Sequence, residues 1–108
     1  MSDKTQELKP EALKSMLEYQ EGAVVSRTLI QKKTGTLTLF AFDKGEGLSE
    51  HTSPYEAIVY MVEGTMTITI SGEEYTVEGG EMLTLPADEP HALDAEAPCK
   101  MLLFMVRS

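Results

Sequence analysis

The sequence predicts an all-β fold, a sandwich or barrel of short strands preceded by one short helix. Three observations carry this prediction. From residue 23 onward, apolar and polar residues alternate with a period of two, as they do in half-buried strands. Beyond about residue 30, turn signals recur every 8–12 residues, a spacing typical of sandwiches and barrels. The chain has 108 residues without a linker or a repeat, so residues 1–108 are expected to form one domain.

Residues 1–22 are predicted to form an N-terminal helical segment. Leu13, Met16 and Leu17 recur at the i, i+3 and i+4 spacing of one helix face. Pro10 suits the first turn, and Gly22 suits the position just beyond a helix C-terminus. Because such a helix is short, we expect it to pack against the rest of the domain rather than stand alone.

The remaining chain is predicted to form eight to ten short strands. The first is Ala23–Ile30, and Thr34-Gly35 marks the turn that follows it. The next strand, Thr36–Phe42, has apolar side chains on both faces, so both faces are expected to be covered. Asp43–Gly47 then breaks the sheet. Further strands are predicted at Ile58–Val62, Thr65–Ile70, Tyr75–Val77, Met82–Leu85, His91–Leu93 and Lys100–Val106.

The charge distribution argues against several classes of partner. The formal net charge is −9, from 9 basic and 18 acidic residues. The block from Gly45 to Cys99 holds twelve acidic and no basic side chains, whereas the block from Met1 to Lys44 carries a net charge of +1. We therefore expect no nucleic acid or phosphate partner, because both need basic surface. We also expect no membrane partner and no secretion, since neither a run of about 18 apolar residues nor a leader is visible.

The cysteine content bears on the cellular setting. Cys99 is the only cysteine, so the chain can form no internal disulfide. A free thiol is typical of a reducing compartment, and we therefore expect a cytoplasmic protein.

The sequence around the two histidines resembles two known motifs. Five residues separate Gly45 from His51, and five separate Gly80 from Pro86, which precedes His91. These spacings are similar to those of the cupin superfamily, whose motifs are G-x5-H-x-H-x3-4-E-x6-G and G-x5-P-x-G-x2-H-x3-N. The resemblance implies a small single-domain cupin of the conserved-barrel type, with the fold of a double-stranded β-helix, or jelly-roll barrel.

The resemblance also implies a division of the chain and an oligomeric state. It covers residues 34–106, which would form the barrel core. Small cupins often pair as homodimers by exchanging an N-terminal strand or adding it to the partner's sheet. Residues 23–33 are the candidate strand, because an apolar stretch there would otherwise leave an exposed sheet edge.

The metal ligands of the family are incomplete in this chain. In metal-binding cupins, two histidines and a carboxylate of the first motif and one histidine of the second hold a divalent metal. The first and last of these positions are His51 and His91, but Ser53 stands at the second histidine position and Ala57 at the carboxylate position. Two imidazoles alone make a poor transition-metal site, because such metals usually take three or more protein ligands.

Other departures leave one question open. Asp88 replaces the second glycine and Ala95 the asparagine of the second motif. Glu56 lies one residue from the carboxylate position, and a shift of one residue along a strand points a side chain to the opposite face. A bulge at Pro54 would be needed to turn Glu56 inward.

Two functions follow from this incomplete ligand set. The first is a non-catalytic or weakly catalytic barrel without a cofactor, which binds a small neutral or cationic ligand at His51, Ser53, Tyr55 and His91. The acidic block motivates the charge preference, because its field repels anions. The second is a metal-dependent enzyme of the dioxygenase or isomerase type, with His51 and His91 as ligands of a divalent transition metal.

A softer metal site is a further alternative. Cys99, Met101 and Met105 share one face of the last predicted strand. Thiol, thioether and imidazole groups together could hold a copper ion. Methionine and free cysteine are also ordinary core residues, and an apolar barrel accounts for them without a metal.

Overall fold

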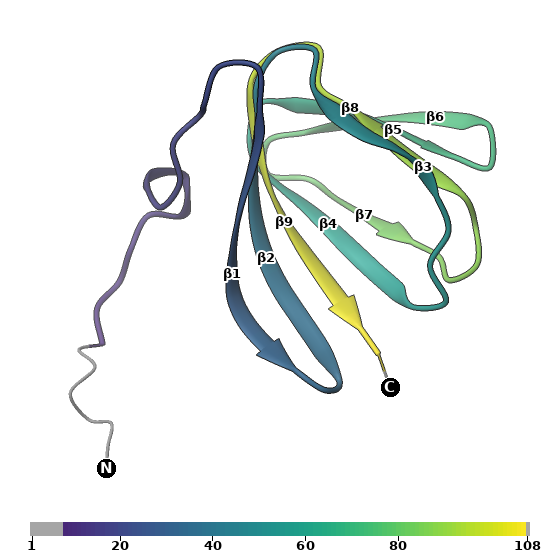
Figure 1. Cartoon of the computed structure of the whole chain (residues 1–108), viewed down its shortest axis with the longest axis horizontal. Coiled ribbons are helices and arrows are strands. Elements are labelled where there is room, and N and C mark those ends of the chain that lie inside the picture. Colours follow the sequence, from purple (N-terminus) through teal and green to yellow (C-terminus); the bar gives the residue numbers. More distant parts are fainter. Residues whose placement is uncertain (1–7, 108) are drawn as a thin grey trace.

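Two antiparallel sheets face each other in the computed structural model, which describes residues 8–107. The five-stranded sheet has the order β1-β2-β9-β4-β7 and the four-stranded sheet the order β3-β8-β5-β6 (Figure 1). This architecture confirms the predicted all-β, double-stranded β-helix. The strands are β1 (Val24–Lys32), β2 (Gly35–Phe42), β3 (Gly47–His51), β4 (Glu56–Glu63), β5 (Thr65–Ile70), β6 (Glu73–Glu78), β7 (Met82–Leu85), β8 (His91–Asp94) and β9 (Cys99–Val106).

The apolar core lies between the two sheets. On β4, Ala57, Val59 and Met61 are buried at every second position, as the alternation in the sequence requires. Met66 and Ile68 of β5 belong to the same core cluster and reach it from the opposite sheet. The period of two in the sequence therefore produces one continuous core.

Strand β9 gives the five-stranded sheet two distinct apolar faces. It pairs with β2 on one side and with β4 on the other. Met101, Leu103 and Met105 alternate with Leu102 and Phe104 along it, so the two sets point to opposite faces. The first set packs in or against the core, whereas Phe104 is 46% exposed on the outer face.

A glycine is required at the turn between β4 and β5. Gly64 has a φ of +81°, in the left-handed region that favours glycine. A Cβ atom at this position would lie 2.7 Å from the Cβ atom of Cys99 and 2.8 Å from the carbonyl oxygen of Pro98. The close approach lets the β4–β5 turn pack directly on the start of β9.

The predicted N-terminal helix is wrong. Within the described residues, the segment 1–22 contains only a 3-10 turn at Leu13–Ser15, and residues 1–7 of the prediction lie outside the described part. Ala12 at the N-cap makes no side-chain hydrogen bond to this turn, and no acidic residue lies in its first turn. A helix this short gains too little to offset the cost of nucleation without such support.

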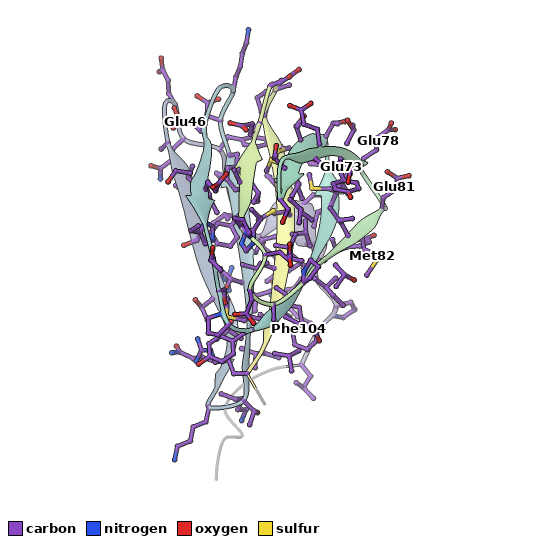
Figure 2. All side chains as sticks on the ribbon, turned by 90° about the vertical axis from the view of Figure 1, so that its right-hand side faces the viewer. Glu46, Glu73, Glu78, Glu81, Met82 and Phe104 are labelled. Atoms are coloured by element: carbon purple, nitrogen blue, oxygen red, sulfur yellow. The ribbon has the colours of Figure 1, made fainter. Side chains whose placement is uncertain are left out.

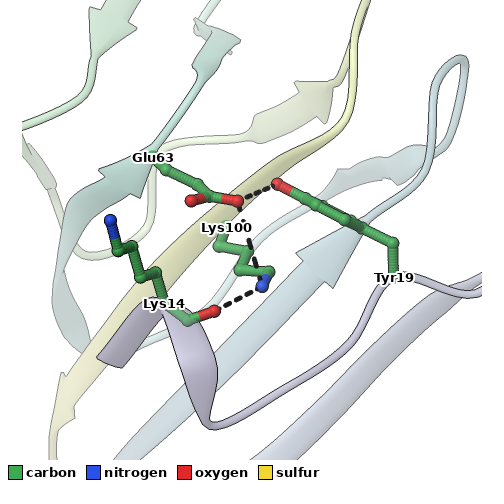
Figure 3. A network of polar contacts seen from close by, with 4 residues as sticks. All are labelled: Lys14, Tyr19, Glu63 and Lys100. Carbon is green, nitrogen blue, oxygen red and sulfur yellow. Dashed lines mark hydrogen bonds and ion pairs between the residues drawn. The ribbon is translucent and has the colours of Figure 1, made fainter. Parts of the chain in front are cut away.

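A polar network holds the N-terminal segment on the outer face of the five-stranded sheet (Figure 3). The Tyr19 hydroxyl donates a hydrogen bond to Oε2 of Glu63 over 2.6 Å, and Nζ of Lys100 lies 3.9 Å from the same oxygen. Nζ of Lys100 also donates to the carbonyl oxygen of Lys14 and lies 4.7 Å from the centre of the Tyr19 ring. Burial and the hydrogen bond to Glu63 raise the pKa of Tyr19. The segment therefore covers the part of this face around Lys100, whose side chain is buried.

Two details of the strands differ from the sequence prediction. The segment Gly47–His51 forms β3, which the sequence pattern did not predict because its residues show no apolar alternation. Strand β1 pairs with β2 of the same chain from Val24↔Phe42 to Lys32↔Gly35. The exchange of residues 23–33 between two chains stays a prediction.

The acidic side chains lie mostly on the surface. Figure 2 shows Glu46, Glu73, Glu78 and Glu81 projecting away from the ribbon. Of these, Glu73, Glu78 and Glu81 are fully classed among the exposed residues at the ends of β6 and the turn after it. Among residues 8–107, no helix has the length and apolar character needed to cross a membrane.

Candidate functional site

The pairing of β3 with β8 brings the two histidines together. His51 and His91 are direct partners in the register, after an irregularity in β3 between Leu48 and His51. Their Nε2 atoms lie 3.1 Å apart. The rings meet edge to face, with centres 4.3 Å apart and an angle of 71° between their planes. Residues 40 positions apart in the sequence thus form one polar pair.

Backbone carbonyl groups fix the opposite side of each ring. Nδ1 of His51 lies 2.8 Å from the carbonyl oxygen of Ser49, and Nδ1 of His91 lies 3.2 Å from that of Glu89. A carbonyl oxygen only accepts a hydrogen bond, so both contacts assign the ring proton to Nδ1. In the neutral pair, each Nε2 atom then carries a lone pair directed toward the other.

The two histidines differ in exposure. His91 is 7% exposed, whereas His51 is an exposed residue. Burial lowers the pKa of His91, the carbonyl oxygen of Glu89 raises it in part, and the neighbouring His51 lowers it further. The net direction is downward, so neutral pH favours the uncharged form of His91.

Two loops are tied together beside the pair. The backbone N–H of Asp88 donates a hydrogen bond to the carbonyl oxygen of Ser53 over 2.7 Å. Asp88 has a φ of +66°, although it replaces the glycine of the second motif. Aspartate is one of the few non-glycine residues that adopts this left-handed conformation readily. The departure from the motif therefore keeps the backbone that positions His91.

A cavity of about 90 Å³ opens beside the histidines between the two sheets. All four residues predicted as a ligand site, His51, Ser53, Tyr55 and His91, line it. The sequence analysis did not assign the apolar lining, for which the alternation along β9 was the available signal. This lining consists of Leu48, Ala57, Leu85, Leu93, Met101, Leu103 and Met105.

Ser53 and Tyr55 lie on the loop that leads into β4. Oγ of Ser53 accepts a hydrogen bond from the backbone N–H of Tyr55 over 3.1 Å, so part of its capacity is used within the loop. The Tyr55 ring is 39% exposed, and the guanidinium carbon of Arg107 lies 5.9 Å from its centre. These two residues place hydroxyl groups on the exposed side of the cavity, whereas His91 lies on its buried side.

The carboxylate position of the metal motif is apolar in the structure. Ala57 is 6% exposed and lines the cavity, whereas Glu56 is exposed on the opposite face. The register between β4 and β9 is regular from Glu56 to Met61, so no bulge turns Glu56 inward. Within residues 8–107, no three His, Cys, Asp or Glu side chains gather closely enough to hold a metal ion. The residues present do not fit the complete metal centre of the family.

The softer metal site is also only partly assembled. Met101 and Met105 line the cavity, but Cys99 does not. The Cys99 thiol is fully buried in the core, and burial raises its pKa to about 11. A protonated thiol is a poor metal ligand, because the thiolate is the form that binds.

Comparison with known proteins adds a family and several relatives. Residues 38–106 match the family described as Cupin domain. The polyketide synthase CurC of Streptomyces cyaneus is 35% identical over 71 residues, which are 60% of this chain and 46% of CurC. The chain thus matches about half the length of this curated relative.

Solved structures resemble the whole described fold. A conserved protein of unknown function from Streptococcus pyogenes is 35% identical, with a TM-score of 0.90 over 95% of this chain and 90% of that chain. A cupin superfamily protein from Desulfitobacterium hafniense is 26% identical, with a TM-score of 0.90 over 95% and 94% of the two chains. A conserved barrel domain protein from Leptotrichia buccalis is 41% identical, with a TM-score of 0.81 over 83% of this chain and 44% of that chain.

Proposed function

The chain belongs to the cupin family, and we propose that it is a barrel that binds a small neutral or cationic molecule through the His51–His91 pair. The molecule donates a hydrogen bond to the pair and places a short apolar part against the methionine and leucine side chains. The carrying observation is the 3.1 Å separation of the two Nε2 atoms beside the cavity.

A count of protons supports a hydrogen-bond donor as the ligand head group. The pair makes three contacts: two from Nδ1 atoms to carbonyl oxygens and one between the Nε2 atoms. Two neutral imidazoles supply only two N–H protons for these three contacts. The lowered pKa of His91 disfavours a third proton from solvent at neutral pH. A hydroxyl or ammonium group of a ligand can supply it, because both Nε2 atoms then act as acceptors.

The lining and size of the cavity restrict the rest of the molecule. Apart from the two histidines, Ser53 and Tyr55, every lining side chain is apolar. A volume of about 90 Å³ corresponds to about three water molecules at about 30 Å³ each. A head group with about three carbon atoms matches this volume, and a polyketide chain of the kind that the name of CurC implies is too large for it.

The charge of the surroundings supports the preference against anions. No basic side chain lines the cavity, and the nearest cation placed by a contact is Arg107, against the Tyr55 ring. The chain carries a net charge of −9, concentrated in the block that contains both motifs. The summed field therefore favours neutral and positive ligands. The single free thiol, Cys99, supports the expectation that binding takes place in the cytoplasm.

Metal-dependent catalysis is the second candidate function, and one distance favours it. Two nitrogen ligands that each lie about 2.0–2.1 Å from one ion can be about 3.1 Å apart, which is the separation of the Nε2 atoms here. His51 and His91 would then hold the ion, and the ion would polarise a bound oxygen. The missing carboxylate at Ala57 is the reason that we rank this function second.

Three probes of equal length test the binding proposal. Titration calorimetry and thermal shift would use 1-propanol, propylammonium and propionate with the untagged protein at pH 7.5. We expect affinities in the millimolar range for 1-propanol and propylammonium, as suits ligands of four heavy atoms, and none for propionate. Binding should be lost in the double variant His51→Ala, His91→Ala and retained in Tyr75→Phe, a control on the outside of β6. Preferential binding of propionate would contradict the proposal.

Metal analysis separates the two candidate functions. The protein, purified without a histidine tag, would be analysed for metals by mass spectrometry, beside the same double variant. We expect no stoichiometric metal and no change of melting temperature with a chelator. A stoichiometric metal that is lost in the double variant would favour the enzyme instead.

A further inference from the structure

The outer face of the five-stranded sheet carries an open apolar groove of about 530 Å³, far from the histidines. The side chains that form it, called the outer apolar face below, are Ile30, Ile58, Tyr60, Leu102, Phe104 and Val106. Ile30 is 52% exposed, Phe104 46% and Val106 41%. Apolar patches of this kind on a soluble domain commonly mark an interaction site.

The N-terminal segment covers only part of this side of the sheet. Leu39 and Ala41 of β2 share its outward direction, because they pair with Leu102 and Lys100 of β9. Both are completely buried at the end where Tyr19 contacts Glu63. Figure 1 shows the chain before the 3-10 turn standing apart from β1, and Leu8 in it is 96% exposed. The outer apolar face is therefore left without a cover in the described part of the chain.

We propose that a second copy of this chain packs on the outer apolar face and forms a two-fold symmetric dimer. The segment Met1–Glu7 is a poor alternative cover, because Met1 is its single apolar residue. A second copy offers the same apolar surface, and a two-fold axis makes each contact occur twice.

Charge on the two sides of the face selects the direction of the axis. The register places Lys32, Gly35, Val106 and Glu56 in one row across β1, β2, β9 and β4. The row thus begins with a cation at the sheet edge and ends with an anion three strands away. An axis parallel to β9, midway between β2 and β9, sets Lys32 of each copy opposite Glu56 of the other. An axis perpendicular to the strands would instead set Lys32 opposite Arg27, which carries the same charge.

The apolar rows agree with this arrangement. In the next row, Ile30 pairs with Leu37, Leu37 with Phe104, and Phe104 with Ile58. The same axis stacks Ile30 of one copy on Ile58 of the other and Leu37 on Phe104. The N-terminal segments keep the covered ends of the two sheets apart, so the contact is confined to the open rows.

The area indicates a dimer that dissociates on dilution. Strands are about 4.8 Å apart and alternate residues about 6.8 Å apart along a strand, so four strands and three rows span about 19 by 20 Å. The footprint is about 400 Å² per copy, against about 800 Å² in a standard interface. We therefore expect a dissociation constant in the micromolar range rather than a permanent dimer.

Sedimentation velocity of the untagged full chain tests the proposal. Between about 1 and 300 μM, the range in which so small an interface dissociates, the mass should rise from 11.9 kDa toward twice that value. Phe104→Ser should weaken association at least tenfold. Tyr75→Ser is the matched control, an aromatic of 38% exposure on the other sheet, and should not change it. Circular dichroism would show that both variants remain folded.

A charge exchange tests the axis. Lys32→Glu and Glu56→Lys should each weaken association several-fold, and the double variant should restore it, most clearly at low salt. A mass of 11.9 kDa throughout the concentration range would overturn the proposal. So would a dimer that is insensitive to Phe104→Ser, which would point to strand exchange, and so would a double variant as weak as the single ones.

Discussion

The inner and outer faces of the five-stranded sheet are both apolar, but different groups accompany the apolar side chains. The inner face, with Met101 and Met105, encloses a small cavity closed by two imidazoles. The outer face, with Phe104 and Val106, is open and carries opposite charges at its two sides. One alternating strand, β9, supplies both. An enclosed apolar wall with one polar pair suits a small molecule, whereas an open apolar face with charged edges suits a folded partner.

The largest difference between the faces should appear in stability. Met101→Ala removes a fully buried side chain and should lower the free energy of unfolding by about 2–5 kcal/mol. Phe104→Ala removes a ring that is 46% exposed and should cost about 1 kcal/mol or less in the monomer. Urea denaturation at concentrations below dimer formation measures both. Equal losses would contradict the distinction between a core face and an open face.

A carboxylate placed on each face sharpens the comparison. Ala57→Glu buries a carboxylate beside the histidines and should lower the free energy of unfolding by about 1–3 kcal/mol without metal. Zn²⁺ should recover this loss, because the new side chain supplies a third ligand. Thr84→Glu on the outer side of β7 is the control and should gain nothing from Zn²⁺. An equal response of both variants in thermal unfolding with Zn²⁺ would refute the inward direction of position 57.

The covered part of the outer face should depend on its polar network. Tyr19→Phe removes the 2.6 Å hydrogen bond to Glu63 and should lower the free energy of unfolding by about 1 kcal/mol. Tyr75→Phe removes a comparable bond to Glu73 at an exposed site and should cause no measurable change. If both variants unfold at the same urea concentration as the wild type, the N-terminal segment does not stabilise the sheet.

The smallest effect concerns pH and the inner face alone. Burial lowers the pKa of His91 below the value of about 6.5 in the unfolded chain. Below that pH the unfolded state binds more protons, so stability is complete above about pH 6.5 and falls as pH drops toward the folded pKa. His91→Gln should flatten this part of the curve in urea titrations between about pH 5 and 7. An unchanged slope would show that His91 is not held neutral by burial.

The sequence predicted those elements in which alternation is regular and failed where tertiary contacts decide. Thr65–Ile70 and Met82–Leu85 agree with β5 and β7 residue for residue. Strand β3 was missed, because its conformation depends on pairing with β8 rather than on its own apolar pattern. The helix was predicted from the spacing of Leu13, Met16 and Leu17, but these residues pack on the sheet without the caps that a short helix needs.

The candidate site shows the same limit. The motif spacing predicted the neighbourhood of His51 and His91, and the geometry agrees with it. The orientation of the two rings could not be predicted, because it depends on the carbonyl groups of Ser49 and Glu89. Those carbonyl groups are positioned by the backbone of two loops, which residue types alone do not specify.

The ring protons of the two histidines test the central claim most directly. Long-range ¹⁵N–¹H correlation spectra of the imidazoles at pH 7.5 report which nitrogen carries the proton. We predict that Nδ1 is protonated in both His51 and His91 and that both Nε2 atoms are free acceptors. Their resonances should shift with propylammonium and not with propionate. A proton on Nε2 of either ring in the free protein, or equal shifts with both probes, would contradict the account.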